Sequence, residues 1–140
     1  MKSRKNIFII AIIVIVLLFT LYSLQDHIVF KRKFYIPIER DTNIVELGFN
    51  HDEFPAWYWY AILEVNEREY QDLLLKMEEV GFYDDDALEK INLQWYSDWI
   101  PAENIVKTFI HHTNIGGRRL HVRVFVSESI DGNRRLYFLR

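Results

Sequence analysis

The sequence contains no cysteine. This absence excludes a disulfide framework, a thiol nucleophile and a lipid attached through an N-terminal cysteine. A bacterial extracytoplasmic domain that folds without disulfides fits this composition, and so does a cytosolic domain. The chain also lacks a Gly-x-Ser-x-Gly turn, a glycine-rich phosphate loop and a His-Glu-x-x-His helix, which are motifs of common hydrolases and nucleotide-binding enzymes. These absences favour a non-enzymatic protein, and no motif is specific enough to assign a family.

Charge is absent from residues 7–24, a continuous apolar stretch. As a helix it would span about 27 Å, close to the hydrocarbon thickness of a bilayer. A buried core helix would carry a polar stripe, which this stretch lacks. A cleaved signal peptide has an apolar region of only about 7–15 residues and then small residues, whereas the best site here, Leu21-Tyr22-Ser23, begins with a large one. The stretch is therefore predicted to be an uncleaved signal-anchor that contacts the lipid bilayer.

Basic residues flank both ends of this span. Lys2, Arg4 and Lys5 precede it, and the basic run 31–33 begins seven residues after Leu24. Because Lys and Arg close to a span favour the cytoplasmic side, the nearer cluster predicts a cytoplasmic N-terminus. The chain then divides into residues 1–25, a basic tip and transmembrane anchor in the cell membrane, and residues 26–140, one extracytoplasmic domain. The run 31–33 has two open roles, contact with anionic headgroups or protection of a strand edge.

The net charge of −3 hides an uneven distribution. Residues 41–103 contain sixteen acidic and three basic residues, and residues 118–140 contain six arginines against two acidic residues. The two regions form either separate charged faces, each available to a partner, or ion pairs with each other. Nucleic-acid binding is not expected, because the acidic middle offsets the arginines.

The periodicity predicts an α+β domain with a mainly antiparallel sheet and one principal helix. Residues 56–65 alternate as a strand with two largely apolar faces. Asn66 and Glu69 form a capping-box pair at the start of a helix over 67–80, which Gly81 ends. The remaining expectations concern segments with weaker patterns. They are an extended segment at 28–38, a loop with a short extended piece at 44–47, a turn at 82–86, a short helix at 87–91, and an aromatic lip or core plug at 95–101.

The last forty residues predict a three-stranded antiparallel meander. Its strands are 105–112, 119–127 and 134–139, joined by turns at Gly116-Gly117 and Asp131-Gly132. Strict alternation places one set of side chains inward and one outward. The inward set is Leu120, Val122, Val124 and Val126, and the outward set is Arg119, His121, Arg123 and Phe125.

A turn at Gly116-Gly117 places His112 opposite His121, close enough for both imidazoles to bind one ion. A register shifted by one residue would place His111 there instead. The third ligand would come from the loop that contains His51, Asp52 and Glu53. The simpler alternative is a solvated polar sheet face, and Arg123 beside the pair would repel a cation. Zinc is the metal that this pair would suit.

We therefore expect a membrane-anchored, non-enzymatic binding or accessory domain whose partner is another envelope protein. Its candidate binding surface comprises Arg119, Arg123, Asp84, Asp85 and Asp86. A metal-assisted hydrolase built on His112 and His121 is one alternative. An immunity-type protein, whose acidic surface neutralises a basic toxin, is another.

Overall fold

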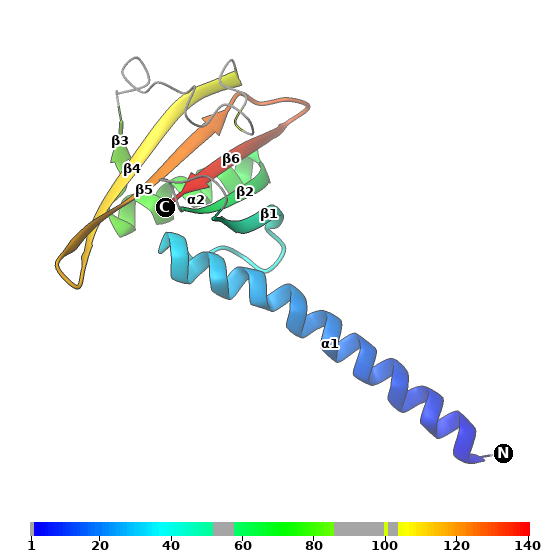
Figure 1. The fold of residues 1–140 in the computed structure, drawn as a ribbon. Coiled ribbons are helices and arrows are strands. Elements are labelled where there is room, and N and C mark those ends of the chain that lie inside the picture. Colours follow the sequence, from blue (N-terminus) through cyan, green and yellow to red (C-terminus); the bar gives the residue numbers. More distant parts are fainter. Residues whose placement is uncertain (1, 52–57, 86–99, 101–103) are drawn as a thin grey trace.

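The computed structural model describes residues 2–51, 58–85, 100 and 104–140 (Figure 1). In order, the elements are α1 (Lys2–Phe34), β1 (Asn43–Asn50), β2 (Tyr58–Asn66), α2 (Glu67–Val80), β3 (Tyr83–Asp84), β4 (Ile105–Ile115), β5 (Arg118–Ser127) and β6 (Asn133–Leu139). The strands form one sheet in the order β1-β2-β6-β5-β4-β3, with antiparallel neighbours throughout. This confirms the α+β class, with one principal helix beside a long N-terminal helix.

Helix α1 is longer than the apolar stretch that predicted it. Figure 1 shows its N-terminal part projecting away from the rest of the molecule, while its C-terminal end lies against the sheet. All described side chains from Ile7 to Tyr22 are exposed. The helix runs without a break to Phe34, after which Tyr35 adopts a left-handed conformation (φ 65°) and donates its N–H to the Lys31 carbonyl. By length and composition, α1 is the one helix among the described residues that is long and apolar enough to cross a membrane.

The prediction of an extended segment at 28–38 is therefore wrong. Phe30 and Phe34 lie four residues apart on one face of the helix, and both are fully buried. Their rings are 5.0 Å apart, and both contact Phe138 of β6 at centroid distances of 4.9 and 5.5 Å. Burial of two phenylalanines on one stripe requires helical spacing, because a strand would also place Arg32 on their face. The C-terminal end of α1 thus enters the hydrophobic core of the domain.

Helix α2 has the bounds that the sequence predicts. The Asn66 side chain accepts the Glu69 N–H, the Glu69 side chain accepts the Asn66 N–H, and Gly81 ends the helix at φ 101°. The apolar stripe Tyr70, Leu73 and Met77 is buried against the sheet. Both capping signals and the stripe are local features of the sequence, so the prediction did not depend on the rest of the fold.

The C-terminal meander is also confirmed. Gly116 and Gly117 both have positive φ, as a primed two-residue turn requires, and Ile115 pairs with Arg118. Asp131 and Gly132 form the second turn in the same way. Strand β4 extends to Ile115, further than predicted. The third strand, β6, then pairs with β2 as well as β5, which joins the meander to the earlier strands.

Both faces of the sheet carry buried clusters, which differs from the prediction for β5. One face packs against α1 and α2 around residues such as Leu63, Val124 and Phe138. The other face carries a second cluster, comprising Ile62, Ile100, Phe125, Tyr137 and Leu139. Phe125 was predicted to point outward, but it is fully buried in this second cluster. The alternation itself is correct, and this face is exposed at Arg119 and His121 but buried at Phe125.

The structure also differs from the predictions for two short segments. The extended piece expected at 44–47 is the middle of β1, an eight-residue edge strand paired with β2. Residues 82–86 were expected to form a turn, but Tyr83–Asp84 pairs with β4 as β3, because Gly81 redirects the chain along the sheet edge. The short helix expected at 87–91 and all of the aromatic segment 95–101 except Ile100 lie outside the described residues.

Candidate functional site

His112 and His121 are directly opposed on β4 and β5, as the register predicted. Their ring centroids are 4.5 Å apart, the rings are nearly perpendicular, and the two Nδ1 atoms are in hydrogen-bonding contact. A hydrogen bond between two Nδ1 atoms requires a proton on one and a lone pair on the other, so one ring is the donor and the other the acceptor. The Tyr83 ring lies 5.7 Å from the His112 ring.

The adjoining strands bring several of the predicted binding residues to the same sheet edge. Arg119 and Arg123 alternate with His121 on the same face of β5, and Arg123 Nε lies 3.6 Å from Asp85 Oδ2. We call the group on this face the histidine patch. It comprises Tyr83, Asp85, His112, Arg119, His121 and Arg123.

Asp84 and Asp86 are not part of the histidine patch. Asp84 pairs with Lys107 at 3.2 Å and, next to Asp85 in an extended strand, belongs to the opposite face. Asp86 lies outside the described residues. Since Asp84 and Asp85 both have cationic neighbours, less of their charge is available to a basic partner than the acidic run alone suggested.

Of the predicted metal ligands, the structure brings His112 and His121 together. His111 is directed to the other face, where its Nδ1 lies 3.2 Å from the Gly81 carbonyl and its ring stacks on Phe82. His51 stacks on Phe49 of β1, and four strand spacings, about 19 Å, separate β1 from β4. Asp52 and Glu53 lie outside the described residues. Among the residues that the structure describes, no group of three His, Asp or Glu side chains could hold a metal ion, so zinc binding at His112 and His121 stays a prediction.

The surroundings of the histidine pair lower the pKa of His112. Desolvation is the largest cause, followed by the neighbouring His121 and Arg119, because each disfavours a second positive charge. These surroundings therefore disfavour the charged form of the His112 imidazole.

Acidification should destabilise the fold through this pair. A histidine whose pKa is lower in the folded state binds fewer protons there than in the unfolded chain, whose value is about 6.5. The stabilisation is present above about pH 6.5 and is lost as the pH falls toward the folded pKa of His112. Urea unfolding at about pH 7.5 and about pH 5.5 should give a lower midpoint in acid, with a smaller difference in His121→Gln. A His112 ring that titrates above the ordinary value by NMR would contradict this prediction.

A second polar site, which the sequence did not indicate, lies where the β5–β6 hairpin meets β2 and Asn104, the residue before β4. It is a cavity of about 350 Å³. Its lining residues are Glu64, Asn104, Ser127, Glu128, Ile130, Asp131, Asn133, Arg134, Arg135 and Tyr137. The sequence did contain one signal near this cavity, the Arg134-Arg135 pair just after the Asp131-Gly132 turn. Adjacent residues of a strand point to opposite faces of a sheet, so the pair places one arginine on each face.

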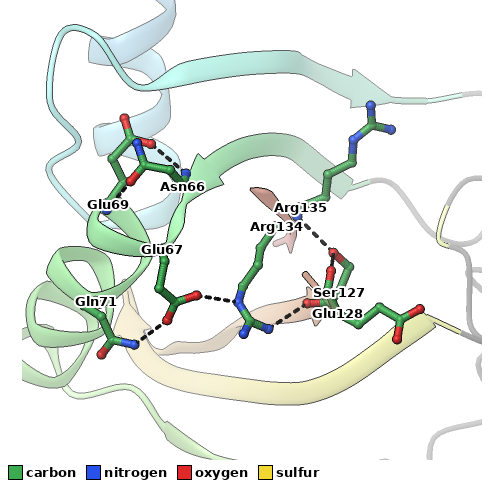
Figure 2. Close-up of polar contacts among 8 residues, drawn as sticks. All are labelled: Asn66, Glu67, Glu69, Gln71, Ser127, Glu128, Arg134 and Arg135. Carbon is green, nitrogen blue, oxygen red and sulfur yellow. Dashed lines mark hydrogen bonds and ion pairs between the residues drawn. The ribbon is translucent and has the colours of Figure 1, made fainter. Parts of the chain in front are cut away.

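The two arginines of this cavity are held by hydrogen bonds and ion pairs within the fold. Figure 2 shows Arg134 between Glu67 and Ser127, with Nε 3.2 Å from Glu67 Oε2 and Nη1 3.4 Å from the Ser127 carbonyl. The Arg135 N–H donates to Ser127 Oγ, and its Nε donates to Glu64. Hydrogen bonds from Gln71 and then Arg134 hold the pKa of Glu67 below its ordinary value. These contacts fasten the hairpin to α2 and β2, which makes them structural.

The ion pairs also bear on the two interpretations of the charge distribution. Arg123, Arg134 and Arg135 of the basic C-terminal region each contact an acidic residue of the middle region. Arg119, at the far end of the histidine patch, is exposed. The two charged regions thus pair with each other in part.

Comparison with protein-family models, curated proteins and solved structures finds no match to this chain.

Proposed function

We propose that this chain is a single-pass membrane protein whose α+β domain is a non-enzymatic binding domain outside the cytoplasmic membrane. The observation that carries the proposal is the course of α1. One uninterrupted helix exposes every described apolar side chain from Ile7 to Tyr22 and then buries Phe30 and Phe34 in the core of the domain.

The exposed part of α1 needs an apolar environment. Its side chains expose between 46% and 74% of their surface, for example Phe19 at 74% and Ile15 at 65%. Exposure of apolar surface costs about 25 cal/mol per Å² in water. The row of residues from Ile7 to Tyr22 is apolar on all sides of the helix. A bilayer removes this cost without a protein partner, because the length of the row matches the hydrocarbon core.

The proposed orientation of the span in the membrane rests on the basic residues at its two ends. Lys2, Arg4 and Lys5 adjoin the span directly, whereas Lys31 is seven residues beyond Leu24. The nearer cluster favours a cytoplasmic N-terminus, and the domain then lies on the outer side.

The histidine patch is the proposed contact surface for another envelope protein. It combines an aromatic ring, two imidazoles, two guanidinium groups and one carboxylate on a β-sheet surface, and Arg and Tyr are enriched in protein interfaces. The patch lies on the face of the sheet opposite to the one that α1 packs against, so a partner would approach it without meeting the anchor helix.

Because the chain has no cysteine, single-cysteine variants report on topology without background. Ser129→Cys in the β5–β6 connection should react with a membrane-impermeant maleimide in intact spheroplasts, and Ser3→Cys only after lysis. The chain should also resist alkaline carbonate extraction. Release by carbonate would disprove the anchor, and labelling of Ser3→Cys alone would reverse the orientation.

The same approach tests the contact surface. A benzophenone maleimide attached to Arg119→Cys should give one discrete crosslinked product in intact cells. Arg68→Cys, at an exposed position on α2, is the matched control and should give none. Equal crosslinking from both positions, or from neither, would place the partner elsewhere.

A further inference from the structure

The basic run 31–33 occupies the last turn of α1, which removes one of its two predicted roles. A helical segment has no strand edge to protect. Lys33 is used within the fold, because its Nζ lies 4.3 Å above the Trp59 ring and its carbonyl accepts a hydrogen bond from Arg140 at 3.2 Å. Lys31 and Arg32 are exposed. Two cations at the end of the anchor helix thus remain available to a ligand outside the domain.

The height of these cations above the bilayer is set by the helix. With about 1.5 Å of rise per residue, Lys31 lies about 10 Å and Arg32 about 12 Å beyond Leu24. Headgroups extend several ångströms beyond the hydrocarbon on each side, and the Debye length at physiological salt is about 8 Å. Helical side chains lean toward the helix N-terminus, which in α1 is the direction of the bilayer. Both cations therefore lie within reach of the headgroup region.

The packing of α1 keeps this height constant. Leu24, Asp26 and His27 are partly buried, and Phe30 and Phe34 are fully buried, so the helix is held by the domain from its membrane end onward. No flexible linker separates the span from the core. Lys31 and Arg32 are therefore positioned at the bilayer surface without the entropy loss that a disordered basic segment would incur.

We propose that Lys31 and Arg32 bind the headgroups of anionic lipids in the leaflet next to the domain. This inference rests on the proposed membrane anchor and adds a lipid preference to it. Each basic residue near an anionic surface contributes up to about five-fold in association. The acidic region, residues 41–103, would be repelled from an anionic surface. The two cations therefore favour an arrangement in which the end of α1, and not the acidic region, lies nearest the headgroups.

The competing role of Lys31 and Arg32 is internal. Cations in the last turn of a helix offset its negative C-terminal end, and this would act on stability without any lipid preference. A measurement of lipid selectivity separates the two roles, because the helix end is the same in every bilayer.

The test uses the full chain reconstituted in phosphatidylcholine vesicles with trace spin-labelled phosphatidylglycerol or spin-labelled phosphatidylcholine. Electron spin resonance gives the ratio of the two association constants. At low salt the ratio for the wild type should exceed that for Lys31→Gln/Arg32→Gln by about five-fold to 25-fold, since two cations are removed. The difference should disappear at about 1 M salt, where the Debye length is about 3 Å.

Two matched variants control for net charge and for helix stability. Arg68→Gln/Arg118→Gln removes two exposed cations from α2 and the β4–β5 turn and should keep the wild-type ratio. Lys31→Arg/Arg32→Lys should keep it as well. The N-terminal cluster is present in every variant, so its own lipid preference cancels in the comparison.

An equal ratio in the wild type and Lys31→Gln/Arg32→Gln would overturn the inference while leaving the anchor intact. An equal loss in both charge-removing variants would overturn it too, since net charge alone would then be responsible. If neither spin-labelled lipid shows a motionally restricted component, the chain is not embedded, and the proposed anchor fails together with the lipid preference.

Discussion

Replacement of Phe34 by alanine is expected to lower the free energy of unfolding of the domain by about 3–5 kcal/mol. Phe34 is fully buried although it belongs to the long apolar helix α1, and its ring contacts those of Phe30 and Phe138. Truncation removes the ring contacts with both neighbours and leaves a cavity where α1 meets β6. The large cost follows because the end of α1 is part of the main hydrophobic core.

Urea unfolding of the full chain in detergent micelles, followed by tryptophan fluorescence, would measure this effect. Ile28→Ala is the matched control, because Ile28 lies on the same helical segment but exposes 59% of its surface. Its unfolding midpoint should stay close to that of the wild type. Similar midpoints for Phe34→Ala and Ile28→Ala would show that α1 does not dock on the domain in solution.

Phe125→Ala is expected to have an effect of the same size, about 3–5 kcal/mol. Phe125 is fully buried in the second cluster, together with Ile100, Tyr137 and neighbouring side chains. A phenylalanine on a solvated sheet face, as the alternation in β5 suggested, would cost much less to truncate. This substitution therefore distinguishes a sheet with two covered faces from a sheet with one.

Val106→Ala is the control for Phe125→Ala. Val106 lies on the neighbouring strand β4 at an irregularity in its pairing with β5, and it exposes 53% of its surface. The same unfolding experiment should give a change within about 0.5 kcal/mol for this variant. A small effect for Phe125→Ala would mean that the second face is open in solution.

These two phenylalanines mark the two faces of the sheet. Phe34 packs the end of α1 into the main core, and Phe125 is buried in the cluster on the opposite face. The histidine patch lies toward the edge of the sheet away from β1.

The candidate site illustrates how far local patterns reach. The Gly116-Gly117 turn was sufficient to place His112 opposite His121, because a two-residue turn determines register. The sequence also placed His111 on the other face by alternation. It did not reveal that Asp85 approaches Arg123, since this contact depends on β3 joining the sheet edge after α2. The cavity beside Arg134 and Arg135 likewise depends on the meeting of three elements.

The end of α1 was ambiguous for a different reason. Residues 28–34 contain a short apolar run and then three basic residues, which resembles a strand interrupted by charge, while Phe30 and Phe34 also fit one face of a helix. Extension of an existing helix needs no new nucleus, and Phe138 from the last strand covers both rings. The partner that decides between the two patterns lies at the opposite end of the chain.

The sequence by itself determined the apolar span, helix α2 and the hairpin turns, because length, capping residues and glycines act within a few neighbouring residues. Tertiary structure alone decided that α1 continues into the core, that Phe125 is buried and that Asp85 meets Arg123. Each of these depends on which distant segments cover a surface. Alternation along one strand or helix gives the direction of a side chain but does not show what lies opposite to it.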